Sequence, residues 1–220
     1  EPLSYGALFS QVEATVVALN DYGIGRNDRV AVVLPNGPEM AAAFVGIASG
    51  ATCAPLNPAY KADEFEFYLR DLEAKVLVTA QGSESPAVAV AEGNGIPVLR
   101  LCRDDGDPAG AFSLRGPDFD AQLRDADLDE AQLDDIDPTE FAEPSDTALV
   151  LHTSGTTSRP KIVPLTHANV LASAANIAQT LRLTPEDRCL NVMPLFHIHG
   201  LMGVVLSSFA AGAAVVATPG

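Results

Sequence analysis

The nine residues TSGTTSRPK, at positions 153–161, follow the apolar run ALVL at 148–151 after a single histidine. Such a run predicts a buried strand, and the glycine after it permits a turn in which backbone N–H groups point inward. Hydroxyl groups donate to phosphate oxygens, and a lysine ammonium neutralises their charge. The pattern predicts a phosphate-binding turn at the end of a strand, made of Thr153, Ser154, Gly155, Thr156, Thr157, Ser158 and Lys161.

A surface loop rich in serine, threonine and glycine is the alternative interpretation of these residues. Pro160 and Lys161 lead directly into a second apolar segment, residues 162–165, so both ends of the turn are held. That arrangement favours a binding turn over a linker. The common phosphate-loop pattern G-x-x-x-x-G-K-[ST] does not occur in the sequence, so the predicted turn is of another kind.

The motif TSGTT followed by PK resembles the phosphate-loop signature of the adenylate-forming, or AMP-binding, superfamily, which includes acyl-CoA synthetases, luciferases and peptide-synthetase adenylation domains. Two positions differ from that signature, because Ser158 and Ile162 stand where glycine is usual. The form of the motif, with LHT at 151–153 and MPLFHIHG at 193–200, is most similar to the oxalate-CoA ligase branch.

The resemblance implies a reaction in two steps. A substrate carboxylate attacks the α-phosphorus of ATP to give an acyl-adenylate and pyrophosphate, and the thiol of CoA then takes the acyl group. ATP with Mg²⁺, CoA and a small-molecule carboxylic acid are therefore the expected cofactors and substrates. His197 would line the acyl and pantetheine pocket as the catalytic candidate, and His199 and Gly200 would complete the substrate pocket. An imidazole at position 199 suits a small dianion such as oxalate.

The histidines have other interpretations. In extended backbone, His197 and His199 would share a face and could ligate a metal. No third ligand stands at a supporting spacing, so no protein metal site is expected. His152 and His167 are interpreted as local hydrogen-bonding residues, beside the turn and at a helix start. Because no G-x-S-x-G motif accompanies them, hydrolase chemistry is unsupported.

The composition describes a globular chain with a net charge of −16. This charge disfavours nucleic acid and anionic membranes as partners, because both are themselves negative. Three widely spaced cysteines without a C-x-x-C pair fit reduced thiols in a cytoplasmic protein. The apolar residues 200–217 are interrupted by two serines and a glycine, which predicts a buried helix and a buried strand rather than a membrane span.

Strand and helix patterns alternate along the chain. Continuous apolar runs of strand length are separated by segments with helical periodicity, and this alternation predicts an α/β fold of layered, mostly parallel sheets with helices on both faces. The expected strands lie at 29–34, 52–56, 75–79, 96–101 and 189–193, and the expected helices at 4–23, 38–49, 61–72, 86–92 and from 166 to 181.

Residues 104–146 contain fifteen acidic side chains and two arginines. No EF-hand calcium loop occurs there, so an acidic, solvated connector with one short helix is expected. Members of the resembling family continue into an adenine-binding segment and a small lid domain with a catalytic lysine. We therefore expect residues 1–220 to form an incomplete N-terminal AMP-binding domain without the C-terminal lid domain, inactive until joined by the missing part of the same protein.

Three alternatives stay open at this point. The chain could be a non-catalytic nucleotide- or phosphate-binding module, which would need no lid. It could be a transferase such as a kinase, which would move the γ-phosphoryl group instead of releasing pyrophosphate. Within the ligase interpretation, the substrate could be a medium-chain, long-chain or aromatic acid rather than oxalate.

Overall fold

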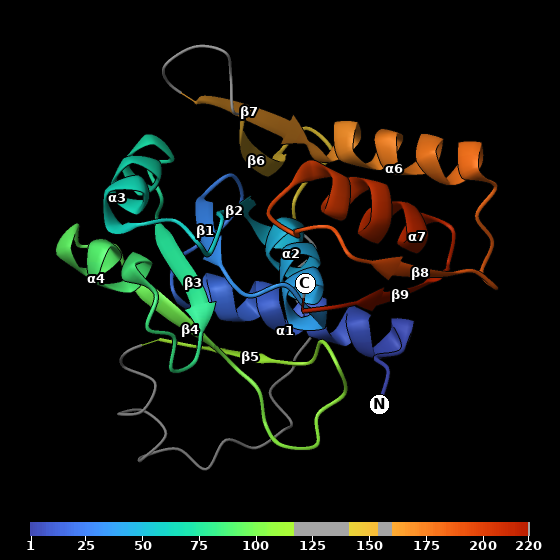
Figure 1. Ribbon diagram of the computed structural model, residues 1–220, viewed down its shortest axis with the longest axis horizontal. Coiled ribbons are helices and arrows are strands. Elements are labelled where there is room, and N and C mark those ends of the chain that lie inside the picture. Colours follow the sequence, from blue (N-terminus) through green and yellow to red (C-terminus); the bar gives the residue numbers. More distant parts are fainter. Residues whose placement is uncertain (117–140, 154–159, 220) are drawn as a thin grey trace.

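The computed structural model describes residues 1–116, 141–153 and 160–219. Helices and strands alternate along the chain as the sequence predicts, and Figure 1 shows the helices placed around a central sheet. The elements in chain order are α1 (Tyr5–Asp21), β1 (Arg29–Val33), α2 (Pro38–Gly50), β2 (Thr52–Pro55), α3 (Ala62–Asp71), β3 (Val76–Ala80), α4 (Pro86–Gly93), β4 (Val98–Cys102), β5 (Ser113–Arg115), β6 (Thr147–Thr153), β7 (Lys161–Thr166), α6 (His167–Leu181), β8 (Arg188–Asn191), the π-helix η3 (His199–Leu206), α7 (Ser207–Ala210) and β9 (Ala214–Ala217).

Within the described residues, the larger sheet has seven strands in the order β5-β4-β3-β1-β2-β6-β7. The five inner strands are parallel to their neighbours, with β1 paired to β2 on one side and β3 on the other. The edge strands β5 and β7 are antiparallel to β4 and β6, because the chain doubles back at both places without a crossover helix. The prediction of an α/β fold with a mostly parallel sheet is confirmed.

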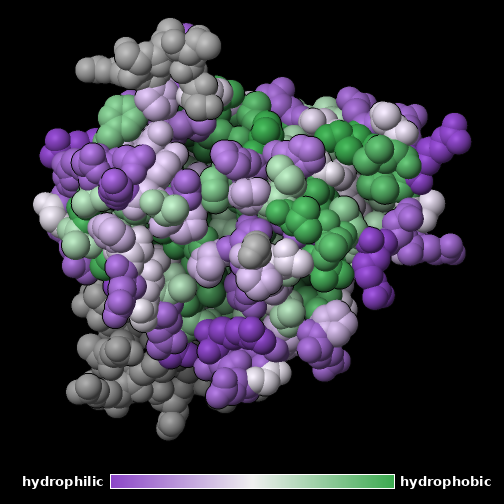
Figure 2. All heavy atoms as spheres, in the orientation of Figure 1, coloured by the Kyte–Doolittle hydropathy of each residue, from purple (hydrophilic) through white to green (hydrophobic). Residues whose placement is uncertain are grey.

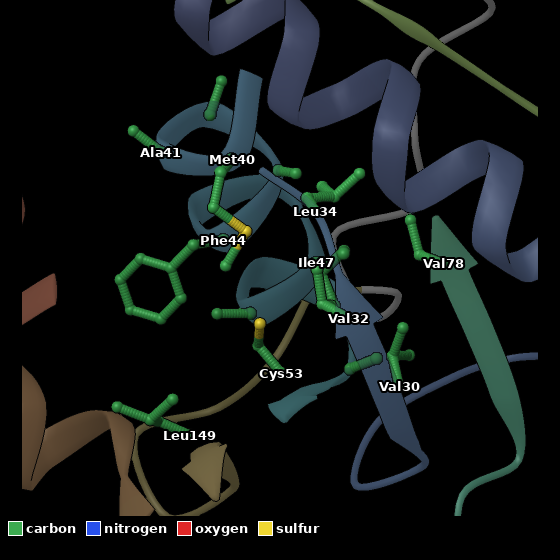
Figure 3. Packing of buried hydrophobic residues seen from close by; sticks show 14 of the residues in the cluster. Val30, Val32, Leu34, Met40, Ala41, Phe44, Ile47, Cys53, Val78 and Leu149 are labelled. Atoms are coloured by element: carbon green, nitrogen blue, oxygen red, sulfur yellow. The ribbon is translucent and has the colours of Figure 1, made fainter. Parts of the chain in front are cut away.

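The central strand β1 is buried on both faces, as its unbroken apolar sequence predicts. Val30 and Val32 point toward α1 and α2, where Met40 and Phe44 join the same core cluster (Figure 3). Ala31 and the residues that alternate with it belong to a second cluster built with α3 and α4. Helices therefore cover both faces of the sheet, which leaves the strand ends as the places open to a ligand.

Helices α1 and α2 pack closely because small residues meet at their crossing. A Cβ atom on Gly46 would lie 2.8 Å from Thr15 Oγ1, so only glycine allows this approach. Thr15 is 2% exposed and donates its hydroxyl proton to the carbonyl of Gln11 at 2.7 Å. The start of α1 follows the predicted cap, since Ser4 Oγ accepts a hydrogen bond from the Ala7 N–H.

The described part of the acidic segment 104–146 differs from the expected solvated connector. It contains strand β5, whose Leu114 is buried in the core together with the preceding Phe112. The apolar residues Phe112 and Leu114 account for this, because β5 pairs with β4 and completes one edge of the sheet. Residues 117–140, where the expected short helix would fall, lie outside the described residues.

The carboxyl end of the acidic segment is tied to the loop before β1 by Asp146, which is 6% exposed. Its carboxylate accepts from Arg26 Nε at 2.6 Å, from Asn27 Nδ2 at 2.9 Å and from the Glu143 backbone N–H at 2.7 Å. Hydrogen bonding to Arg26 is the main reason that the pKa of Asp146 lies well below its usual range. Asn27 Oδ1 in turn accepts from the Thr147 N–H, so the starts of β1 and β6 are joined.

Strands β8 and β9 form a separate parallel pair. The prediction of a buried strand near the end of the chain is wrong for β9, because Val216 is 43% exposed and its register partner Leu190 is 59% exposed. Figure 2 shows hydrophobic side chains gathered on the half of the molecule that carries α6, β8 and β9. Among the described residues, no element covers the face of this pair that carries Leu190 and Val216.

The apolar stretch after residue 200 forms η3 and α7, and Leu201 and Val205 are fully buried, as predicted for the helix. Among the described residues, no helix combines the length and the apolar character needed to cross a bilayer.

Candidate nucleotide and acid site

Strands β6 and β1 end at the same edge of the main sheet, and a polar side chain stands at or just beyond the end of each. Strand β6 is parallel to β2, and β2 is parallel to β1, so their carboxyl ends lie side by side. Thr153 ends β6, and Asn36 follows the end of β1 by three residues. In open α/β sheets, ligands bind outside the carboxyl ends of the strands. This carboxyl edge is therefore the candidate site.

The predicted phosphate-binding turn is anchored by strand pairing at its two ends. Thr153 and Lys161 are register partners in the antiparallel ladder of β6 and β7, and Thr153 Oγ1 donates to the Lys161 carbonyl at 3.4 Å. Both residues are exposed. The structure thus brings together the first and last residues of the turn, while the other predicted residues, Ser154, Gly155, Thr156, Thr157 and Ser158, lie outside the described residues.

His152, the residue before this turn, contacts two side chains of α3. Its ring Nε2 lies 3.0 Å from Asp71 Oδ2, and the ring of Tyr68 meets it edge-on with centroids 4.6 Å apart. Burial lowers the pKa of His152, and the nearby Asp71 carboxylate offsets part of that effect. His152 is a hydrogen-bonding residue beside the turn, as predicted, but its partner is not local: the contact with Asp71 joins α3 to the end of β6.

His167 lies at the opposite end of this hairpin, as the first residue of α6. Its backbone N–H donates to the Asp146 carbonyl at 3.0 Å, and the preceding Thr166 caps the helix by accepting from the Asn169 N–H. Burial lowers the pKa of the His167 imidazole. The predicted position at a helix start is confirmed, but His167 Nε2 is buried and has no hydrogen-bond partner among the described residues, so local hydrogen bonding by the imidazole stays a prediction.

The second chemical segment is a tight turn at residues 194–200. The His197 N–H donates to the Pro194 carbonyl at 3.2 Å, and His199 begins η3. The expectation that His197 and His199 share a face in extended backbone is therefore wrong, because the chain turns and becomes helical between them. Both imidazoles are exposed, and the His197 ring lies against Phe196 with centroids 4.5 Å apart.

Gly200 is required by this turn for a steric reason. It is buried, and a Cβ atom added to it would lie 2.6 Å from the Pro194 carbonyl oxygen. Any side chain would push the backbone of residues 193–194 away. The pocket role of Gly200 stays a prediction, and the structure gives it a steric role: it lets the chain turn back close to Pro194, next to the two histidines.

Sequence reasoning missed the residue that ties this turn to the sheet. Asn36 Nδ2 donates to the carbonyls of Met193 and Thr218 at 3.2 Å each, and Asn36 Oδ1 accepts from the Leu195 N–H at 2.7 Å. A signal was present, since Asn36 is an amide placed just beyond the carboxyl end of a buried strand. Its partners could not be read from the sequence.

The side-chain amide of Asn191 belongs to the same hydrogen-bond network. Asn191 is fully buried at the end of β8, and its Nδ2 also donates to the Met193 carbonyl, at 3.1 Å. The Met193 N–H donates back to Asn191 Oδ1 at 3.1 Å. The Asn191 carbonyl accepts from the Thr218 hydroxyl at 3.0 Å. The turn is thus held by neutral amide groups.

The metal interpretation of the two imidazoles finds no support in the donor set. Among residues 1–116, 141–153 and 160–219, no group of three or more histidine, cysteine, aspartate or glutamate side chains is placed to hold a metal ion. The two exposed imidazoles make no ion pair with any carboxylate that the structure describes, which fits an anionic ligand better than a resident cation.

The fold is an α/β domain whose candidate site combines the predicted phosphate turn, which ends at Lys161, with a turn that presents two imidazoles. Comparison with known proteins gives the family. Residues 1–220 match the model of the family described as AMP-binding enzyme, and the chain belongs to that family.

Three relatives illustrate the similarity. The chain is 41% identical to an oxalate–CoA ligase of Saccharomyces cerevisiae over 209 residues, 90% of this chain and 38% of the relative. It is 41% identical to an oxalate–CoA ligase of Arabidopsis thaliana over 218 residues, 97% of this chain and 39% of the relative. ATP-bound MatB from Rhodopseudomonas palustris has a TM-score of 0.75 at 26% identity, and the match covers 98% of this chain and 40% of MatB. The chain spans less than half the length of each of these proteins.

Proposed function

We propose that this chain is the N-terminal part of an ATP-dependent ligase that joins a carboxylic acid to CoA. The observation that carries the proposal is the 41% identity to two proteins named oxalate–CoA ligase, across nearly the whole of this chain. The geometry agrees with it, because the predicted phosphate turn follows β6, and the histidine turn is bound by Asn36, just beyond the parallel strand β1 of the same sheet. A reaction between ATP and an acid needs such neighbouring subsites.

In the first step, a carboxylate oxygen of the acid forms a bond to the α-phosphorus of ATP, and the bond from that phosphorus to the pyrophosphate oxygen breaks. Lys161 and the predicted turn, Thr153 to Ser158, bind the leaving pyrophosphate with hydroxyl donors and one ammonium. Mg²⁺ enters with ATP and shares the neutralisation of charge. A carboxylate is already ionised at neutral pH, so this step needs no general base.

In the second step, the thiol of CoA gives up its proton to solvent and its sulfur bonds to the acyl carbon, while the bond from that carbon to the AMP oxygen breaks and AMP leaves with the electron pair. His197 is proposed to line the acyl and pantetheine pocket, and His199 and Gly200 to form the part nearest the acid. Two exposed imidazoles, without a carboxylate beside them, suit a short dicarboxylate such as oxalate. The proposed substrate is therefore a small dianion.

The test is acid-dependent exchange of labelled pyrophosphate into ATP, measured on a protein that contains this chain and matches its relatives in length. A panel of oxalate, malonate, a long-chain acid and an aromatic acid defines the substrate. Exchange that is strongest with oxalate would support the proposal. Preference for a long-chain acid would refute the dianion, and an ADP product without pyrophosphate would indicate a kinase.

We further propose that the 220-residue chain does not complete the reaction by itself. Release of pyrophosphate from the purified chain, at a rate comparable with the longer protein, would contradict this. The competing function, a non-catalytic nucleotide-binding module, would show ATP binding by calorimetry with no acid-dependent exchange in either form.

A further inference from the structure

We infer that Asn36 is a positioning residue: it holds the turn at 194–200, and with it His197 and His199, at a fixed place on the carboxyl edge. The inference rests on the proposed function for what the turn binds, but the positioning role itself can be measured without any substrate.

The argument begins with the place of Asn36 in the fold. It stands just beyond β1, the strand with a parallel neighbour on each side and apolar cores on both faces. Such a strand is the part of the sheet least able to move. A side chain attached to its end therefore gives a rigid reference point for whatever it binds.

The carboxamide of Asn36 is matched to its three partners. Its Nδ2 carries two protons, for the carbonyls of Met193 and Thr218, and its Oδ1 accepts the Leu195 N–H at 2.7 Å. An ionised aspartate could keep the bond from Leu195 but would place negative charge against two carbonyls, and a serine could not reach all three. This set of bonds joins β1, the start of the histidine turn and the residue after β9.

The two ends of the turn are then fixed independently of the imidazoles. Leu195 is 1% exposed and anchors the turn in the main core, while Gly200 lets the returning backbone pass close to Pro194. His197 and His199 stand between these anchors and remain exposed. Their position relative to Thr153 and Lys161 is consequently set by Asn36 through β1 and the strands beside it, because a site requires its supporting residues to be held firmly.

Hydrogen–deuterium exchange of the 220-residue chain tests the role directly. In Asn36→Ala, the Leu195 N–H and the other amides of residues 193–201 should exchange about tenfold faster or more, while those of β1 and β3 keep their protection. Asn36→Asp retains an acceptor for Leu195 and should show a smaller increase at that amide.

Asn94 provides a matched control. Its side chain also makes several hydrogen bonds, to Val90, Glu66 and Arg70, but it joins α3 to α4. Asn94→Ala should leave exchange in residues 193–201 unchanged. The inference is overturned if Asn36→Ala does not speed exchange there, if β1 and β3 lose protection to the same extent, or if both Asn36 variants fail to fold.

A kinetic measurement separates this inference from the proposed function. In the longer protein, Asn36→Asp should raise KM for the acid about tenfold while KM for ATP changes less than twofold, because the phosphate turn is held elsewhere. Faster exchange in residues 193–201 without a change in KM for the acid would keep the positioning role and refute the acid pocket. An equal rise in both KM values would overturn the selective role.

Discussion

The two ends of the parallel strands in the main sheet, called here the amino edge and the carboxyl edge, are stabilised by different kinds of interaction. At the amino edge, where the parallel strands begin, the ion pair between Asp146 and Arg26 joins the start of β6 to the start of β1. At the carboxyl edge, Asn36 and Asn191 hold the histidine turn with neutral amides. The charged groups of the first edge satisfy one another, whereas Lys161, at the second edge, makes no ion pair with any residue that the structure describes.

This difference separates stability from binding. Charges that are fully paired contribute to the fold but offer nothing to a ligand. A neutral framework can fix nearby groups without competing for an anionic ligand, and Lys161, His197 and His199 remain exposed for the ligand we propose. Removing groups from the amino edge should therefore affect stability, and removing groups from the carboxyl edge should affect binding.

Asp146→Ala should have the largest effect on stability. It removes four hydrogen bonds that the carboxylate accepts, two from Arg26, one from Asn27 and one from the Glu143 N–H, and leaves Arg26 with its ion pair to the exposed Glu143. We expect the Tm of the chain to fall by about 6–12 °C in thermal unfolding followed by circular dichroism.

Glu73→Gln is the control for this loss of a carboxylate, because Glu73 lies 3.6 Å from Arg29 and its side chain is 84% exposed. It should shift Tm by less than about 2 °C. An equal shift in Tm for the two variants would show that the ion pair of Asp146 and Arg26 contributes no more than an ordinary surface ion pair.

Gly200→Ala should come next, because the added methyl group would meet the Pro194 carbonyl oxygen at 2.6 Å. We expect a fall in Tm of about 3–6 °C and altered histidine ring signals in NMR spectra. In Gly203→Ala the nearest atom would be His199 Cδ2 at 3.3 Å, and that side chain can rotate away. If Gly203→Ala were the more destabilising of the two, the steric account of the turn would be wrong.

The amino edge should also respond to acid. The folded pKa of Asp146 is lowered, chiefly by Arg26, so its contribution to stability is complete above the unfolded pKa of about 4 and is lost as pH falls through the lower folded value. The difference in urea midpoint between the unmodified chain and Asp146→Asn should be constant from about pH 8 to 5 and shrink below about pH 4. A difference that grew on acidification would contradict the sign.

Lys161→Ala should have the smallest effect on the fold. The side chain is exposed at the start of β7, so Tm should change by less than about 2 °C, while ATP affinity in the longer protein falls about tenfold. Lys75→Ala is the matched control, because Lys75 lies before β3 at the amino edge and pairs with Asp28 at 3.0 Å. It should leave ATP affinity unchanged, and a large loss of Tm in Lys161→Ala would give that lysine a structural role.

The sequence predicts the layers of this fold well. The apolar runs at β1 and β3 and the caps at Ser4 and Thr166 depend on neighbouring residues, so local patterns are sufficient. Strand β5 escaped prediction because it is only three residues long and is formed by pairing with β4, a contact that its own sequence does not indicate.

The site was predictable only in part. The phosphate turn is continuous in sequence, and its first and last residues meet as expected. The conformation of residues 197–199 was not predictable, because it depends on Gly200 and on the hydrogen bonds of Asn36 and Asn191. The partners of Asn36 are 157 and 182 residues away along the chain, and no pattern in one sequence indicates such contacts.

The open pair of strands β8 and β9 has a consequence for the chain in solution. Each of these strands pairs on one side only within the described residues, so unpaired backbone groups stand beside exposed Leu190 and Val216. Edges of this kind add strands from other molecules, but a net charge of −16 makes copies of the chain repel one another. Salt weakens that repulsion within a Debye length of about 10 Å at 0.1 M. We therefore expect light scattering from the isolated chain to rise with ionic strength, so that dilute buffer keeps it dispersed and high salt drives it to self-associate.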